Sequence, residues 1–131
     1  LVALAPVAGG LLAEVLKIGL RRERPRLHDG EYFFRPFSDL PFYTRDIGLP
    51  SSHALVAFAG AWMLCRIWPR AWPVWILLAG GCAVTRVQAG AHFVSDVVVA
   101  AVAAYALVAL IWRRWGTAVS GPVRPASPPV A

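Results

Sequence analysis

A histidine and an aspartate stand four residues apart in a mostly apolar stretch, as His92 and Asp96. On a helix, this spacing would place both side chains on one face, one turn apart. A carboxylate in that position can accept one ring N–H of the imidazole, which leaves the other ring nitrogen as a base or nucleophile. Arg86, six residues before His92, can bring a planar set of donors to an oxyanion beside that nitrogen.

Polar side chains inside apolar segments are costly, and they usually have a function. The alternative for these residues is a satisfied buried His–Asp pair, with the arginine extending to a membrane interface. The segment alone leaves both interpretations open. The rest of the chain decides between them.

The composition favours an integral-membrane protein with one domain. Of its 131 residues, 58% are hydrophobic and 15% are charged, whereas about a quarter of a soluble domain is charged. The formal net charge is +6, but the basic residues lie between apolar runs, which is typical of membrane flanks and anion binding and not of nucleic-acid binding. Because the sequence starts at Leu1 inside an apolar run, we expect a fragment.

Four apolar runs predict helices over residues 1–20, 51–68, 75–88 and 92–112. The fourth is long enough to cross a bilayer, which takes about 20 residues, and the middle two are slightly short. If all four cross, their two polar junctions lie on the same membrane face. We expect a membrane domain over residues 1–115 and a disordered, proline-rich tail over residues 116–131.

A polar loop over residues 27–50 connects the first two predicted helices. It could form an aromatic belt on the lipid headgroups or a rim that grips a lipid tail. Its aromatic residues are Tyr32, Phe33, Phe34, Phe37, Phe42 and Tyr43.

Three separated segments hold a pattern of polar residues with fixed spacing. They are Lys17-x6-Arg24-Pro25, Pro50-Ser51-Ser52-His53 and Arg86-x5-His92-x3-Asp96. In this order they resemble the signature of the type 2 phosphatidic acid phosphatase superfamily: Lys-x6-Arg-Pro, Pro-Ser-Gly-His and Ser-Arg-x5-His-x3-Asp. That superfamily also includes soluble acid phosphatases and vanadium haloperoxidases, but the apolar segments here favour its membrane lipid-phosphatase branch.

Two positions depart from the family pattern. Ser52 stands where the family has glycine, which lets the backbone approach a phosphate closely. Thr85 stands where the family has serine and keeps the hydroxyl. Four other polar residues match no motif position and are interpreted as flanking charges: Arg21, Arg22, Arg26 and His28.

The resemblance implies a role for each motif residue. His92 would be the nucleophile, Asp96 would orient it, and His53 would be the general acid. The phosphate oxygens would be held by Lys17, Arg24 and Arg86, with Ser51 and Ser52 completing the site at a helix N-terminus. Taken singly, the cations could be ordinary flank charges, the serines N-caps and His53 an interfacial histidine. No metal and no cofactor are expected, because the cations are side chains.

The resemblance also implies a fold and a function. We expect an all-α, integral-membrane helical bundle, with four helices of a six-helix phosphatidic acid phosphatase-like fold. The expected activity is metal-independent removal of phosphate from a membrane lipid phosphate or diphosphate through a phosphohistidine. A binding protein without turnover and a lipid phosphotransferase are the alternatives.

The expected partners are the bilayer and the lipid substrate, with no nucleic acid. The expected location is the bacterial inner membrane, with the site facing the periplasm. Arginines flank both ends of the predicted helices, so the positive-inside rule gives this orientation little support. The sequence does not select among phosphatidic acid, phosphatidylglycerophosphate, polyprenyl diphosphates and lipid A phosphates.

Overall fold

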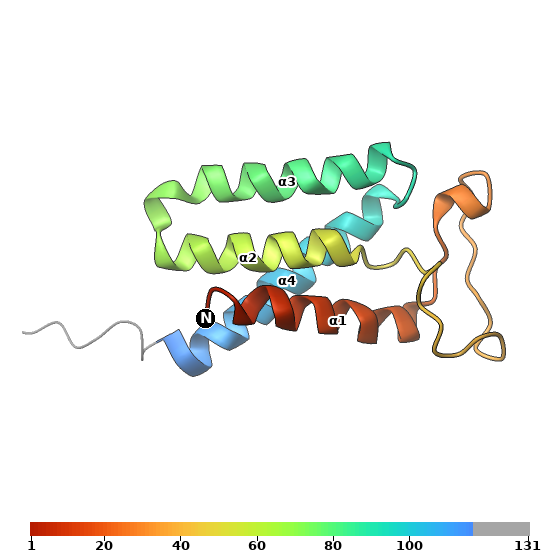
Figure 1. Ribbon diagram of the computed structural model, residues 1–131, viewed down its shortest axis with the longest axis horizontal. Coiled ribbons are helices and arrows are strands. Elements are labelled where there is room, and N and C mark those ends of the chain that lie inside the picture. The colour runs from red at the N-terminus through yellow and green to blue at the C-terminus, as the bar shows by residue number, and fades with distance from the viewer. Residues whose placement is uncertain (117–131) are drawn as a thin grey trace, which may run out of the picture.

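The computed structural model describes residues 1–116, which fold into four α-helices joined at alternating ends (Figure 1). The helices are α1 (Leu4–Leu20), α2 (Ser52–Ile67), α3 (Trp72–Gln88) and α4 (Val94–Trp115), with short 3-10 turns at Pro25–Leu27 and Pro69–Ala71. Residues 1–116 contain no strand, only two isolated β-bridges. The all-α prediction is therefore confirmed. Except for Gly116, the predicted tail lies outside the described residues.

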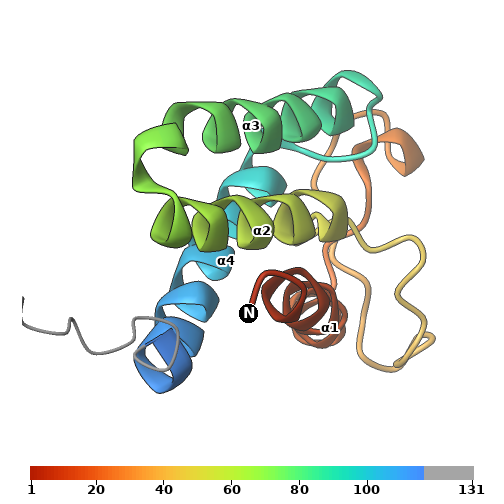
Figure 2. The same cartoon turned by 60° about the vertical axis from the view of Figure 1, so that its left-hand side comes forward.

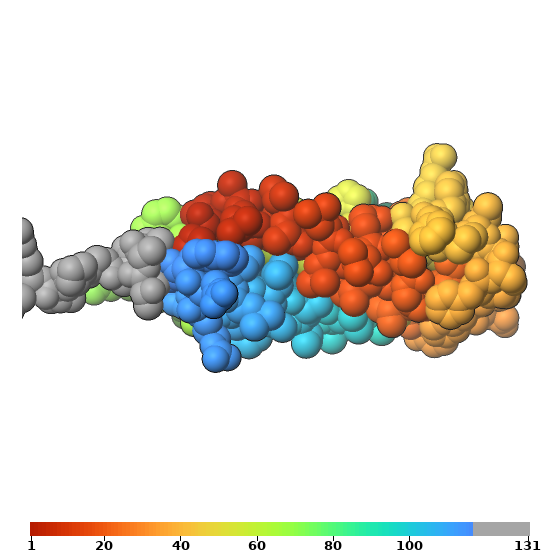
Figure 3. All heavy atoms as spheres, turned by 90° about the horizontal axis from the view of Figure 1, so that it is seen from below, coloured from red at the N-terminus to blue at the C-terminus, as the bar shows by residue number. Residues whose placement is uncertain are grey.

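Helix α2 is the centre of the bundle and packs against α1, α3 and α4 (Figure 2). Helices α1 and α4 lie side by side on the face seen in Figure 3. Small residues allow α1 and α2 to pack closely: a Cβ added to Gly9 on α1 would lie 3.1 Å from Ala59 Cβ on α2. The buried core contains alanines and larger apolar residues: Ala13, Ala54, Ala59, Ala100, Ala104, Leu55, Met63 and Val108.

Among the described helices, α4 alone is long and apolar enough to cross a membrane, with 22 residues and a mean hydropathy of 2.4. The other three have 16 or 17 residues. Their outer faces are nevertheless apolar, as Leu11 on α1 and Leu77 on α3 illustrate with 67% and 75% exposure. Exposed apolar faces of this kind suit contact with lipid or with further helices.

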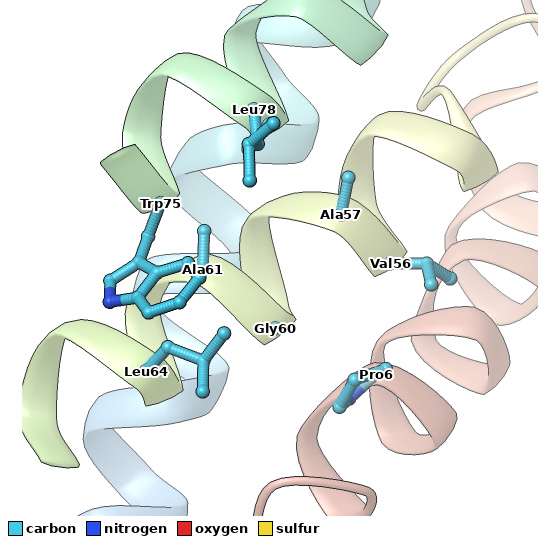
Figure 4. A pocket seen from close by; sticks show the side chains of 9 residues that line it. Pro6, Val56, Ala57, Gly60, Ala61, Leu64, Trp75 and Leu78 are labelled. Carbon is cyan, nitrogen blue, oxygen red and sulfur yellow. The ribbon is translucent and has the colours of Figure 1, made fainter. Parts of the chain in front are cut away.

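An apolar groove runs along α2 between α1 and α3 (Figure 4). None of the residues that line it is ionisable: Pro6, Val56, Ala57, Gly60, Ala61, Leu64, Trp75, Leu78 and Ala79. Hydrolytic chemistry therefore has no acid, base or nucleophile in this groove.

The end of α1, the start of α2, the end of α3 and the start of α4 meet at one end of the bundle, as predicted (Figure 1). Several predicted boundaries were wrong by two or three residues. The end of α1 at Leu20 is as predicted, and Arg21 ends the helix by taking a left-handed conformation with φ 53°. Helix α3 begins earlier than predicted, at Trp72, because Pro73 fits the first turn, where no backbone N–H bond is needed.

The long loop between α1 and α2 is organised around two buried arginines. Arg21 donates to the carbonyl oxygens of Arg35, Pro36, Asp39 and Pro41. Arg35 pairs with Glu23 and donates to the Tyr43 carbonyl at 3.1 Å. The prediction of Arg21 as a flanking charge was wrong: its side chain is buried because the turning loop surrounds the guanidinium with acceptors.

The aromatic side chains of this loop are all exposed. Tyr32 packs against Phe93, with ring centroids 4.5 Å apart, and Phe33 stacks on His28. Phe42 is 80% exposed. An aromatic belt and a rim for lipid tails both stay predictions.

Candidate active site

His92 is buried, and the backbone around it fixes its ring. Its Nδ1 lies 2.9 Å from the Gly48 carbonyl oxygen. A carbonyl can only accept a hydrogen bond, so Nδ1 must carry the proton. In the neutral ring, the free lone pair is therefore on Nε2. This tautomer leaves Nε2 available as a base or nucleophile.

Asp96 lies beside His92 for a different reason from the one predicted. His92 precedes α4, and Phe93 is extended, with φ −73° and ψ 158°. Asp96 is in the first helical turn, where its Oδ2 accepts the Phe93 backbone N–H at 2.8 Å and lies 3.6 Å from His92 Nδ1. The expectation of two side chains on one helical face was wrong, because a helix start brings them together. The ring's hydrogen bond is to Gly48, and Asp96 lies beside it, where it can form an ion pair only with a protonated ring.

Arg22 is the second side chain at Asp96, and the expectation that it is a flanking charge was wrong. Its Nη2 donates to Asp96 Oδ1 and, at 2.7 Å, to Ser95 Oγ. Asp96 is fully buried, so it needs a cationic partner to stay charged at low cost. Neither Arg22 nor Gly48 was identified from the sequence, since Arg22 resembles the arginines around it and Gly48 lies outside the motifs.

Arg24 and Arg86 have donors without partners. Their Nε atoms are buried and have no hydrogen-bond partner in residues 1–116. Burial and the positive charges of Arg26 and Arg86 lower the pKa of Arg24, against the opposing effect of Asp46. A guanidinium remains protonated even so. Two unsatisfied cations near each other make a site where an anion would be favoured.

Lys17 is buried at the end of α1, and its Nζ donates to Glu14 Oε1 at 2.8 Å. Glu14 also accepts from Thr44 Oγ1 at 2.7 Å and from Ser52 Oγ at 3.0 Å. An ammonium group has three donors, so this pair leaves others for a phosphate. The phosphate-binding role of Lys17 stays a prediction.

Ser51 and Ser52 differ in what their hydroxyls do. Ser51 is buried and caps α2, accepting the Ala54 backbone N–H at 3.4 Å. That contact does not use the hydroxyl proton of Ser51, and its phosphate-binding role stays a prediction. The Ser52 hydroxyl instead donates to Glu14 Oε1 at 3.0 Å, and the phosphate-binding role of Ser52 stays a prediction. Ser52 has no positive φ, so serine replaces the family's glycine without backbone strain.

His53 is exposed at the start of α2, beside an open groove lined by Ser52, Val56, Ala57 and Cys82. It lies within electrostatic range of the other motif cations and of the candidate nucleophile: Arg86, His92, Arg24 and Lys17. The three motif segments therefore converge at one end of the bundle. No group of three or more His, Cys, Asp or Glu side chains that could hold a metal occurs among residues 1–116.

A family model, that of the PAP2 superfamily, matches residues 1–120 of the chain. The chain belongs to the PAP2 superfamily. The resemblance drawn from the three motifs is thereby confirmed.

Two curated relatives agree with this assignment. The chain is 36% identical over 94 residues to a lipid A 1-phosphatase of Rhizobium etli and 37% identical over 94 residues to one of Rhizobium johnstonii. Each match covers 70% of this chain but 39% and 37% of the relatives, so the chain spans less than half of their length. No solved structure matches the chain.

Proposed function

We propose that this PAP2 protein removes phosphate from a membrane lipid phosphate or diphosphate through a phosphohistidine at His92. The observation that carries the proposal is the hydrogen bond from Nδ1 to the Gly48 carbonyl oxygen, which leaves Nε2 as the nucleophilic nitrogen. The partnerless donors of Arg24 and Arg86 near His53 support a phosphate site beside it.

In the first step, the Nε2 lone pair of His92 attacks phosphorus while the bond from phosphorus to the lipid oxygen breaks. His53 donates a proton to that leaving oxygen, which departs as the lipid alcohol or phosphate. Lys17, Arg24 and Arg86 oppose the charge on the three non-bridging oxygens. Asp96 stabilises the positive charge that develops on the imidazole.

In the second step, water attacks phosphorus and the P–N bond to His92 breaks. His53, now neutral, takes the proton from the attacking water, and inorganic phosphate is released. Side-chain cations supply the positive charge in both steps, so we propose that no divalent metal is required. The two histidines thus have separate roles in this proposal: His92 is the nucleophile, and His53 donates and accepts the proton.

The relatives carry the name lipid A 1-phosphatase, which makes the 1-phosphate of lipid A the first substrate to test. The apolar helices would hold the protein in the bilayer, and the exposed aromatic loop lies at the same end as the site. We propose a bacterial inner-membrane location with this end toward the periplasm.

The test is phosphate release by the purified full-length protein in detergent, with and without EDTA. The substrates are lipid A, phosphatidic acid, phosphatidylglycerophosphate and undecaprenyl diphosphate. His92→Ala should lower the turnover by at least about 1,000-fold, because removing a nucleophile abolishes the covalent route. His28→Ala is the matched control, since His28 pairs with Glu23 at 2.7 Å in the loop, and it should keep most of the activity.

Trapping with ³²P-labelled substrate should give an acid-labile label in the wild type and none in His92→Ala. Full activity in His92→Ala would refute the mechanism, and loss of activity in EDTA would refute metal independence. Tight lipid binding without phosphate release would identify a binding protein. A new phosphoester formed with an added alcohol would identify a phosphotransferase.

A further inference from the structure

Arg22 is a buried arginine that no motif includes, and it contacts the candidate nucleophile's neighbours twice. Its side chain is 9% exposed, although it comes from the loop that follows α1. Its Nη2 donates to Asp96 Oδ1 and to Ser95 Oγ. Asp96 Oδ2 is the carboxylate oxygen nearest to His92 Nδ1. The guanidinium therefore fixes the rotation of the carboxylate that faces the imidazole.

The backbone of Arg22 makes the second connection. Its carbonyl oxygen accepts the Gly48 N–H at 2.7 Å and the Leu49 N–H at 3.4 Å. The carbonyl of the same Gly48 accepts the proton on His92 Nδ1. Both acceptors that face His92 are thus held by one residue, one through its side chain and one through its main chain.

Aromatic rings limit the movement of the Arg22 side chain. Its guanidinium carbon lies 4.9 Å from the Tyr32 ring centroid and 5.1 Å from the Phe93 ring centroid. Contacts of this kind favour a cation over a ring face. The side chain is therefore placed for Asp96 before any substrate binds.

We propose that Arg22 is a positioning residue for catalysis: it holds Asp96 and Gly48 so that His92 Nε2 points at the phosphorus. The inference rests on the proposed nucleophilic role of His92. Loss of such outer partners of a reactive group typically lowers activity without removing a substrate contact. Arg22 should accordingly affect turnover and leave phosphate binding almost unchanged.

The test compares Arg22→Met with Arg35→Met in the purified full-length protein. Arg35 is a close match: it is a buried arginine in the same loop, pairs with a carboxylate and lies 5.8 Å from an aromatic ring centroid, but it contacts neither Asp96 nor His92. Three quantities are measured for each variant: kcat and KM for lipid hydrolysis, and the inhibition constant of inorganic phosphate.

For Arg22→Met we expect kcat to fall about 10- to 100-fold, with KM and the phosphate inhibition constant changing less than about 3-fold. Arg35→Met should lower the thermal midpoint while kcat stays within about 3-fold of the wild type. If Arg22→Met does not fold, Arg22→Gln replaces it. Gln keeps polar contact with Asp96 without the charge, and the same fall in kcat is expected.

Each other outcome overturns the inference. Unchanged kcat in the Arg22 variant shows that the contact is not needed, and equal losses of kcat in both variants show a general loop effect. A phosphate inhibition constant that rises as much as kcat falls makes Arg22 a phosphate ligand instead. Inactivity of the wild type on all four lipids, together with folded protein, refutes the proposed function itself and is seen before any Arg22 variant is assayed.

Discussion

Two groups of arginines lie at the same end of this bundle, and they differ in what surrounds them. Arg21 and Arg35 are surrounded by loop carbonyls and carboxylates that accept their protons. Arg24 and Arg86 have buried Nε atoms without a partner among residues 1–116. The residue type is the same in both groups, and the sequence distance between Arg21 and Arg24 is three positions.

The difference separates folding from ligand binding. A guanidinium whose donors are used inside the protein stabilises the loop and has little left for a substrate. A buried donor without a partner costs free energy in the unliganded protein, and that cost is recovered when an anion binds. Arg22 combines features of both groups: its buried Nε also has no partner among residues 1–116, but its Nη2 is used on Asp96 and Ser95 next to the candidate nucleophile.

Among the arginine variants, the largest effect should come from removing a cation of the second group. Arg86→Met should lower kcat/KM for lipid hydrolysis by about 100- to 1,000-fold, as the loss of a donor to a developing oxyanion does. Because its Nε has no internal partner, the thermal midpoint should stay close to that of the wild type.

Arg21→Met is the control for the Arg86 prediction, because we expect it to lose stability and to keep its activity. Its four carbonyl partners lose their donor, so the thermal midpoint should fall while kcat/KM stays within about 5-fold. Both quantities are measured in the same detergent. If the two variants lose stability and activity in parallel, the division into two groups is wrong.

An intermediate effect on thermal stability should appear when the pH is lowered and Glu23 in the loop becomes protonated. Burial disfavours the charge on Glu23, but hydrogen bonds from His28 and Arg35 and the charge of Arg35 outweigh burial and lower the pKa of Glu23. A lowered pKa in the folded protein means that the stabilisation is present above the unfolded value and is lost as the pH falls through the folded value. The thermal midpoint should therefore drop below about pH 4.5.

Glu23→Gln isolates this contribution from those of other carboxylates. The variant should be less stable than the wild type near neutral pH and should lose less stability on acidification. Thermal melts at a series of pH values measure both curves. Parallel curves for the two proteins would contradict a paired, ionised Glu23.

The smallest effect should come from restoring the family's glycine. Ser52→Gly removes the hydroxyl that donates to Glu14, while Glu14 keeps Lys17 and Thr44. We expect a loss of about 1 kcal/mol in the free energy of unfolding, from one hydrogen bond and a glycine in a first helical turn. Activity should remain within about 3-fold of the wild type, because Ser52 imposes no unusual backbone conformation.

Ser52→Ala removes the same hydroxyl and keeps the Cβ, so it should behave like the glycine variant in the phosphatase assay. A gain of activity of about 10-fold or more in Ser52→Gly, without a gain in Ser52→Ala, would show that the Cβ blocks approach of the phosphate to the backbone. The comparison thus tests whether the serine is a local substitution or a change in the phosphate site.

Much of the fold was predictable because it depends on local patterns. Apolar runs predicted four helices. If all four cross the membrane in turn, the two polar junctions must lie on the same side, and in the structure they meet at one end of the bundle. Helix boundaries were predicted less well, since α1 begins at Leu4 and α3 at Trp72, each three residues from the predicted start. The start of α4 was placed too early because the sequence did not show that Phe93 is extended.

The sequence by itself determined which residues are the candidates for the chemistry, through the spacing of three short motifs and the placement of serines before a helix. Only the tertiary structure decided which arginines already have hydrogen-bond partners inside the protein. The partners of Arg21 lie 14 to 20 residues away, and those of Arg22 lie 73 and 74 residues away. Backbone carbonyls such as that of Gly48 occur at every residue, so no residue type marks the one that orients His92. The path of the loop brings the Gly48 carbonyl oxygen next to His92 Nδ1.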